Sequence, residues 1–166
     1  VAEYLLINGA ECEPYLTCDH RLMLEKSEEI MVGITIIMKA LGVKKAFIGI
    51  ENNKPDAIKQ LTSLTQKYSN IEVVPLKKKY PQGAEKQLIK AITGREVPSG
   101  KLPIEVGCVV QNVATAKAIY DAVQKNKPLI ERVVTITGPN LSNPSNFLTR
   151  IGVPINHLIE LAGGLP

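Results

Sequence analysis

Two carboxylates one residue apart follow directly after the first apolar run of the chain. The run VAEYLLI ends at Ile7, and the segment NGAECEPYLT (residues 8–17) then presents Glu11 and Glu13 on either side of a cysteine. Ordinary turns use Gly, Asn and Asp for their backbone angles, and Pro14 stops a helix from running through the segment. Glu-Cys-Glu has no such backbone reason to be present, so the residues suggest a chemical role.

The residues alone leave three interpretations of these carboxylates open. In the first, they accept hydrogen bonds from ligand hydroxyls, an amide or a flavin ring. In the second, they belong to a solvated turn or lie near the dipole of a helix that starts around Asp19. Paired carboxylates also serve acid–base hydrolysis. However, residues one apart in a turn need not converge on one bond, and no third group supports hydrolysis.

A lysine-rich loop, KKKYPQGAEKQ (77–87), is the second candidate. Lys77, Lys78 and Lys79 precede Gly83, which lets backbone approach a ligand, and then a helix start, whose free N–H groups favour an anion. A nucleotide phosphate would suit this arrangement. The alternative is a solvated lysine run on a loop.

The third candidate is QNVAT (111–115), in which Asn112 is a suitable N-cap for a following helix. Its amide either caps the helix alone or also contacts a flavin or ribose. The sequence has no G-x-G-x-x-G, Walker loop, nucleophile elbow or metal triad. His20 and His157 stand alone, which is typical of structural or solvated histidines.

Composition limits the function classes. The 166 residues are 45% hydrophobic and 22% charged, which is typical of a globular protein. Aromatics are 4% with no Trp, and the net charge is +4, so the chain lacks a nucleic-acid footprint but permits an anionic small ligand. The spacing of Cys12, Cys18 and Cys108 predicts free thiols and a reducing compartment.

No run of about 18 apolar residues is present, so we expect no direct membrane insertion and no signal peptide. The chain starts in mid-strand at Val1 and ends at AGGLP, which suggests a piece of a longer protein.

Strand and helix patterns alternate along most of the chain. Apolar runs and helical periodicity predict strands at 3–8, 45–51, 71–76 and 108–112, and helices at about 19–41, from Asn53 onward, at 84–93 and at 113–124. Four such units in series predict an α/β fold with a Rossmann-like parallel sheet and helices on both faces. Ligands bind beyond the carboxyl ends of such strands, so we expect the three candidate segments and ENNKP (51–55) at one edge.

After Pro128 the pattern changes. Two β-branched or apolar runs and a short helical pattern follow, at 131–138, 147–152 and 153–164. A hairpin followed by a helix predicts the first half of a β-grasp unit. We therefore divide the chain into domains at 1–128 and 129–166.

Four segments in order resemble the C subunit of the Rnf electron-transport complex. They are INGAECEPYLTCDHRLM, YPQGAEKQLI, VGCVVQNVATAKAIYDAV and RVVTITGPNLSNPSNF. That family shares its flavin-binding fold with the NADH-binding flavoprotein subunit of respiratory complex I. The resemblance covers nearly the whole chain, and the tail resembles the start of a soluble-ligand-binding β-grasp domain.

The resemblance implies roles for the first-strand motif, N-A-D-E-x-E-P in the complex I relative. Asn8 would contact flavin mononucleotide (FMN), Glu11 would lie near the isoalloxazine, and Glu13 would hydrogen-bond NADH. Ala10 replaces the relative's aspartate, so one flavin contact is missing.

Two further motifs of that relative match in part. Gly83 and Glu85 match G-E-E, with Ala84 in place of the first glutamate. Asn112 and Thr115 match N-N-V-E-T and would sit near the FMN phosphate or ribityl chain. Gln111 and Ala114 replace the first asparagine and the glutamate of that motif.

The resemblance also implies a function. In the full protein, hydride would pass from NADH to FMN and electrons then to [4Fe–4S] clusters outside this chain, linked to ferredoxin and ion movement by other subunits of a membrane complex. The protein would sit peripherally on the cytoplasmic face, and this chain alone could not pass electrons onward. The alternative is a docking or binding module with a degenerate flavin site, related to electron donors of amino-acid or cobalamin reductases.

Overall fold

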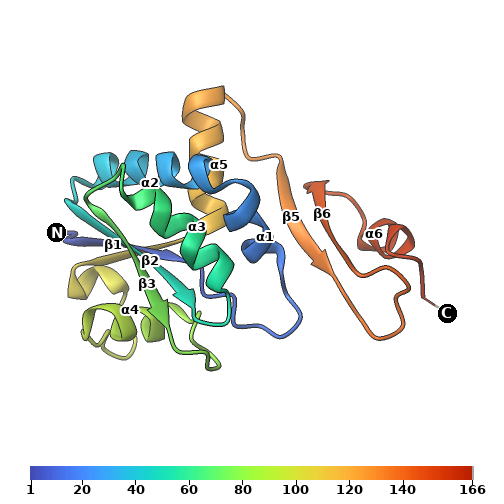
Figure 1. The fold of residues 1–166 in the computed structure, drawn as a ribbon, viewed down its shortest axis with the longest axis horizontal. Helices are drawn as coiled ribbons and strands as arrows, with labels where there is room; N and C mark the ends of the chain where they lie inside the picture. The colour runs from blue at the N-terminus through green and yellow to red at the C-terminus, as the bar shows by residue number, and fades with distance from the viewer. Residues whose placement is uncertain (166) are drawn as a thin grey trace.

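Residues 1–165 are described by a computed structural model, which shows an α/β part followed by a hairpin and a short helix (Figure 1). The strands are β1 (Tyr4–Asn8), β2 (Lys45–Glu51), β3 (Ile71–Leu76), β4 (Cys108–Asn112), β5 (Glu131–Ile136) and β6 (Ser145–Arg150). The helices are α1 (Cys18–Glu25), α2 (Ser27–Leu41), α3 (Pro55–Thr65), α4 (Glu85–Thr93), α5 (Val113–Lys125) and α6 (Ile155–Leu161), with a 3-10 turn at Pro103–Val106.

The first four strands form one parallel sheet in the order β3-β2-β1-β4. Asn8, the last residue of β1, lies opposite Gly49 of β2 and Asn112 of β4. The carboxyl ends of the strands therefore share one edge of the sheet, and the loops that follow them meet there.

Helices cover both faces of the sheet, as predicted. Leu5 and Ile7 point into a core shared with α1, α2, α3 and α5, whereas Leu6 points into a second core with Leu88 and Ile89 of α4. Figure 1 shows α2 and α5 above the sheet and α4 below it. Side chains that alternate along a buried strand feed two cores in this way, and the predicted fold class is confirmed.

The predicted single helix over 19–41 is wrong, because the chain leaves helical geometry at Lys26 and forms two helices. No Gly or Pro marks the break. Ser27 is buried there and accepts a hydrogen bond from Gln60 of α3 at 3.1 Å. The break lets α1 turn away from α2 and pack against both α3 and α5.

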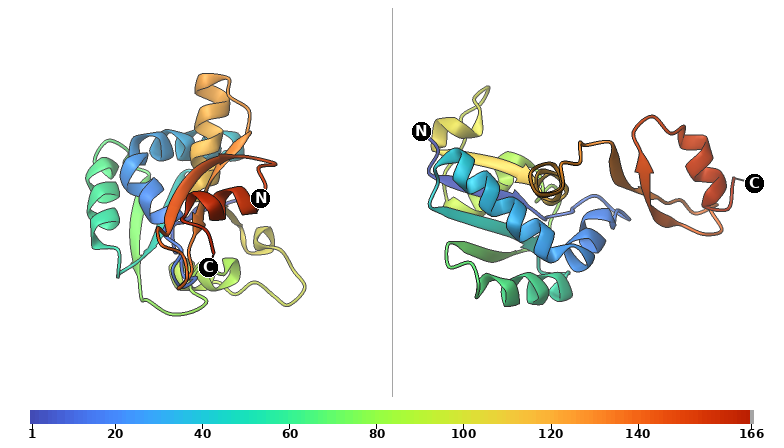
Figure 2. Two further views of the ribbon diagram at one scale, coloured as in Figure 1. Left: turned by 90° about the vertical axis from the view of Figure 1, so that its right-hand side faces the viewer. Right: turned by 90° about the horizontal axis from the view of Figure 1, so that it is seen from above.

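The last part of the described chain is the antiparallel pair β5–β6 with α6. Strand β5 ends two residues earlier than predicted and β6 starts two residues earlier, since Ile136 pairs with Ser145 and residues 137–144 connect the two strands. Figure 2 shows this lobe extending away from the sheet on the side of α1. Within residues 1–165, no helix is both long and apolar enough to cross a bilayer.

Close packing of α2 on α5 gives the first testable prediction. A Cβ at Gly33 would lie 1.9 Å from the carbonyl oxygen of Ala116. We expect Gly33→Ala to lower the free energy of unfolding by about 2 kcal/mol or more, because the helices would have to separate. Urea unfolding measures this change.

Gly138→Ala is the matched control, since its nearest neighbours would lie at 3.8 and 3.9 Å. Equal stability of the two variants would contradict the close approach of these helices.

Candidate functional site

A cleft of about 740 Å³ opens where β1, β2 and β3 end. Its lining comes from the three loops after these strands, with one residue each from α1 and the end of β2: Glu11, Cys12, Glu13, Pro14, Tyr15, Leu16, Thr17, His20, Glu51, Asn53, Lys54, Lys78, Lys79 and Tyr80. A second hollow of about 400 Å³ lies across the Glu11–Glu13 segment and is also lined by Cys18, Asp19 and Gly83. Both volumes are in the range of small-molecule sites. The edge predicted from the parallel sheet is therefore hollowed.

Asn8 joins the first and third of these loops. Its Nδ2 donates to the carbonyl of Gly83 at 2.8 Å, and its Oδ1 accepts from the N–H of Ala10 at 3.1 Å. Gly83 is needed at this contact, because a Cβ there would lie 2.2 Å from the Ala10 carbonyl oxygen. Two predicted site residues are thus brought together, in contact with each other.

The Glu11 carboxylate closes the N-terminus of α1. It accepts from the N–H of Asp19 at 2.8 Å and of His20 at 3.4 Å, and from the Cys18 thiol at 3.4 Å. A carboxylate is favourable there because the first N–H groups of a helix lack internal partners. Of the interpretations open from the sequence, the structure shows the contact with the helix, and the flavin role of Glu11 stays a prediction.

Glu13 lies at the mouth of the cleft and faces the lysine-rich loop. The hydroxyl of Tyr80 donates to its Oε1 at 3.2 Å, and both side chains are exposed. The bond to this carboxylate raises the pKa of Tyr80. Glu13 and Tyr80 each line the two hollows, so a ligand entering either hollow meets this pair.

Asn112 is the N-cap of α5, as predicted, and its Oδ1 accepts from the N–H of Ala114 at 2.7 Å. Its Nδ2 donates to Asp19 Oδ2 at 2.7 Å and, more weakly, to the Asn8 carbonyl at 3.4 Å. Burial raises the pKa of Asp19, and the bond from Asn112 opposes that rise. Thr115 lies half-buried in the first turn of α5.

The lysine-rich loop supplies the positive charge of the site. Lys78 and Lys79 line the cleft and are exposed, and Glu85 lies exposed at the start of α4. The backbone of this loop is fixed from the second strand, since the N–H of Lys78 donates to Asn52 Oδ1 at 3.3 Å. The side chains are therefore placed for an anionic group without being buried.

Sequence reasoning missed the buried pair Glu51 and Lys54, which are 2% and 7% exposed. The Lys54 ammonium lies 3.9 Å from Glu51 Oε2 and donates to the Glu11 carbonyl at 3.0 Å. Glu51 Oε1 also accepts from the N–H of Lys79 at 3.4 Å. Two opposite charges three residues apart at the end of a buried strand were the available signal.

The cysteines are free, as predicted: Cys12 and Cys18 are half-buried and Cys108 is buried. Burial raises the pKa of the Cys18 thiol. Glu11, Cys18 and Asp19 bring three ligand atoms within 4.8 Å of one another. The Glu11 carboxylate already bonds the other two residues, so this cluster forms part of the helix terminus.

A parallel sheet with polar loops and a hollow at its carboxyl edge is the architecture of Rossmann-like domains, the fold class in which ligands bind at that edge. The family model "Nuo51 FMN-binding domain" matches residues 1–121, and the model "SLBB domain" matches residues 133–166. The chain therefore belongs to the Nuo51 FMN-binding domain family.

Curated relatives agree with the predicted resemblance to the Rnf C subunit, which is confirmed. The C subunit of the proton-translocating ferredoxin:NAD(+) oxidoreductase complex of Clostridium ljungdahlii is 54% identical over 98% of this chain and 35% of its own length. The C subunit of the Na(+)-translocating complex of Acetobacterium woodii is 51% identical over 96% of the chain and 36% of its length. The chain thus spans about a third of these relatives.

A solved structure has the same fold. A chain of the NAD+-reducing [NiFe]-hydrogenase in its H2-reduced state superposes with a TM-score of 0.86 at 19% identity. The match covers 99% of this chain and 33% of the hydrogenase chain.

The buried pair predicts a large effect of Lys54→Met. Removal of the ammonium leaves Glu51 buried without its cation, so we expect the free energy of unfolding to fall by about 3 kcal/mol. Chemical denaturation measures it. Lys67→Met is the control, because its pair with Glu28 is exposed and should change stability by less than about 1 kcal/mol. Similar losses in both variants would refute a structural role for the buried pair.

The raised pKa of Asp19 predicts the pH dependence of stability. Because the folded protein holds this proton more tightly than the unfolded chain, the contribution of Asp19 is fully present below the unfolded pKa, 3.8. It is lost as pH rises through the raised folded pKa. Asp19→Asn keeps an acceptor for Asn112 without the charge, so we expect the loss with rising pH to disappear.

Unfolding measured at pH 4, 5.5 and 7 checks this expectation. Asp56→Asn is the control of opposite sign, since the bond to His20 lowers the pKa of Asp56. The Asp56 contribution is present above 3.8 and is lost as pH falls. An unchanged pH profile for Asp19→Asn would show that Asp19 is not the group concerned.

Proposed function

We propose that this chain is the flavin- and NADH-binding module of an Rnf-type C subunit. The observation that carries the proposal is the convergence of three strand-end loops on one hollowed, polar edge, within the part of the chain that matches the FMN-binding family. The names of the two ferredoxin:NAD(+) oxidoreductase subunits support it.

The residues present fit an FMN and dinucleotide ligand in chemistry. Lys78 and Lys79, with the N-terminus of α4 behind Gly83, suit a phosphate group. Glu13 and Tyr80 offer an acceptor and a hydroxyl at the mouth of both hollows, which suits the polar edge of a nicotinamide or flavin. Bound FMN would supply hydride acceptance and one-electron release, and the protein would bind and orient the reactants.

The predicted site residues then divide into two groups. Glu13 and Glu85 are exposed and free to meet a ligand directly, and Thr115 lies in the first turn of α5, which starts at the same sheet edge. Asn8, Glu11 and Asn112 form hydrogen bonds with the loops and helix ends around the hollow. We assign that second group the task of shaping the site, in addition to any flavin contact.

The internal hydrogen bonds of this second group also favour a second candidate function. If Asn8, Glu11 and Asn112 serve only the internal network, and Ala10, Ala84 and Ala114 remove acidic contacts, the chain is a docking module with a degenerate flavin site. In either case we place the complete protein on the cytoplasmic face of a membrane complex, with [4Fe–4S] clusters outside this chain and ferredoxin as an indirect partner. The division at residue 128 into an FMN/NADH-binding part and a partial β-grasp part belongs to the proposal.

The deciding experiment is an FMN titration of the complete gene product, followed by anaerobic addition of NADH while flavin absorbance is recorded. We expect saturable FMN binding and bleaching by NADH. A folded protein that binds no FMN would overturn the flavin role and favour the docking function instead.

Glu13→Ala tests the residue assignment in the same assay. Loss of one charge-assisted hydrogen bond should raise the NADH concentration needed for half-maximal bleaching by about tenfold. Glu25→Ala is the matched control, since Glu25 pairs with Arg21 on the exposed face of α1. Unchanged NADH dependence in Glu13→Ala would remove Glu13 from the site.

A further inference from the structure

The N-terminus of α1 is closed by two side chains, one from the preceding loop and one from the remote strand β5. Its N-cap residue, Thr17, makes no side-chain cap bond. Glu11 takes the N–H groups of Asp19 and His20. Thr135 of β5 takes the two that remain, because its Oγ1 accepts from the N–H of Thr17 at 3.3 Å and of Cys18 at 3.2 Å.

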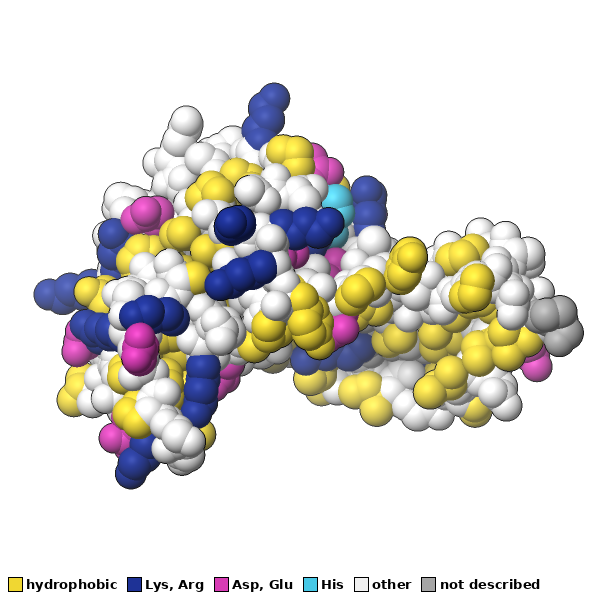
Figure 3. All heavy atoms as spheres, turned by 90° about the horizontal axis from the view of Figure 1, so that it is seen from below, with side chains coloured by type: hydrophobic (Ala, Val, Ile, Leu, Met, Phe, Trp, Pro, Cys, Tyr) yellow, Lys and Arg dark blue, Asp and Glu magenta, His cyan; other side chains and the backbone are white. Residues whose placement is uncertain are grey.

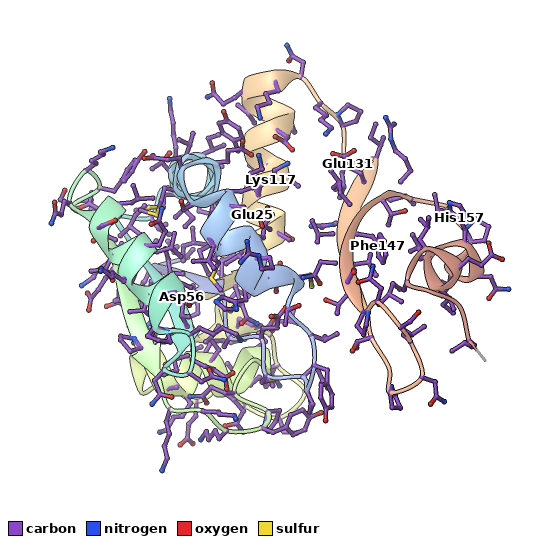
Figure 4. All side chains as sticks on the ribbon, turned by 45° about the vertical axis from the view of Figure 1, so that its right-hand side comes forward. Glu25, Asp56, Lys117, Glu131, Phe147 and His157 are labelled. Atoms are coloured by element: carbon purple, nitrogen blue, oxygen red, sulfur yellow. The ribbon has the colours of Figure 1, made fainter. Side chains whose placement is uncertain are left out.

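The hairpin fixes the direction of the Thr135 hydroxyl. Thr135 donates its proton to Asn146 Oδ1 at 2.7 Å, and Asn146 is its direct partner on β6. The lone pairs of Thr135 are therefore left for the helix. Asn146 Nδ2 in turn donates to Thr17 Oγ1 at 2.9 Å. Figure 4 shows β5 lying between α1 with α5 on one side and the labelled Phe147 and His157 on the other.

The same turn of α1 holds two residues of the proposed site. Asp19 N–H bonds the Glu11 carboxylate, and Asp19 Oδ2 accepts from Asn112 Nδ2 at 2.7 Å. Glu11 belongs to the loop after β1, and Asn112 begins α5 after β4. A shift of this turn would therefore move two strand-end loops together.

We propose that Thr135 is a positioning residue of the flavin site, through which the β5–β6 hairpin holds the first turn of α1, Glu11 and Asn112 in place. The inference rests on the proposed function for its consequence, which is ligand affinity. It assigns the hairpin a part in the site although no hairpin residue lines either hollow at the sheet edge.

The test uses three variants of the complete gene product. Thr135→Val keeps the shape and removes the acceptor, and Thr135→Ser restores it. Thr149→Val is the matched control on β6, where the hydroxyl contacts only its neighbour's carbonyl at 3.5 Å. We expect FMN affinity to fall about tenfold in Thr135→Val and to stay within about twofold of the parent in the other two variants.

Amide hydrogen exchange separates this inference from the proposed function. A purely local role would speed exchange only at Thr17 and Cys18, which Thr135 bonds directly. A positioning role also speeds exchange at Asp19 and His20, which Glu11 bonds. This readout needs no flavin, so it decides the inference even if the parent protein binds none.

The outcomes are distinct. Faster exchange at Asp19 and His20 in Thr135→Val, reversed in Thr135→Ser, supports the positioning role. Faster exchange confined to Thr17 and Cys18 overturns it, whatever the FMN affinity. If Thr135→Val does not fold, Asn146→Ala takes its place, because it removes both the acceptor that directs the Thr135 hydroxyl and the direct bond to Thr17, and we again expect faster exchange at Asp19 and His20.

Discussion

The hydrogen bond and the ion pair of the buried Lys54 ammonium are the interactions on which the arrangement of the loops at the sheet edge depends. It donates to the backbone of the first loop at Glu11 and lies beside Glu51, whose carboxylate accepts from the backbone of the third loop at Lys79. A buried charge needs such partners, since leaving one unpaired costs several kcal/mol. The loops after β1, β2 and β3 therefore adopt one mutual arrangement, and the hollow between them has a defined shape before any ligand arrives.

Much of the fold follows from local pattern. The structure reproduces the predicted bounds of β2, β3 and β4, because each is a short apolar run ended by polar residues. The break at Lys26 was not predictable, since no Gly or Pro marks it and it goes with the packing of α1 against α3 and α5, which are remote in sequence. The edge that carries the site was predictable from topology alone, because parallel strands place their carboxyl ends together.

The partners within the site were beyond sequence reasoning. Glu11 reaches a helix end seven residues on, which its spacing permitted, but Thr135 reaches the same helix end from 117 residues away. Such contacts depend on how two packed parts meet. The lobe formed by β5, β6 and α6 exposes several apolar side chains to solvent, including Leu148, Ile151, Ile155 and Leu161. Figure 3 shows hydrophobic side chains gathered on this lobe and cationic ones spread over the α/β part.

The shared helix end has a consequence for where the molecule can be divided. Helix α5 ends at Lys125 and β5 starts at Glu131, so a short segment of chain links the α/β part to the hairpin. Hydrogen bonds between the two parts reach past this segment, because the N–H groups of Thr17 and Cys18 at the start of α1 donate to Thr135, inside β5. A chain cut after Pro128 would leave the N–H groups of Thr17 and Cys18 to bond water. Glu11 would still accept from the N–H groups of Asp19 and His20. The N-terminus of α1 therefore depends on the hairpin, although the sequence pattern alone separates the two parts.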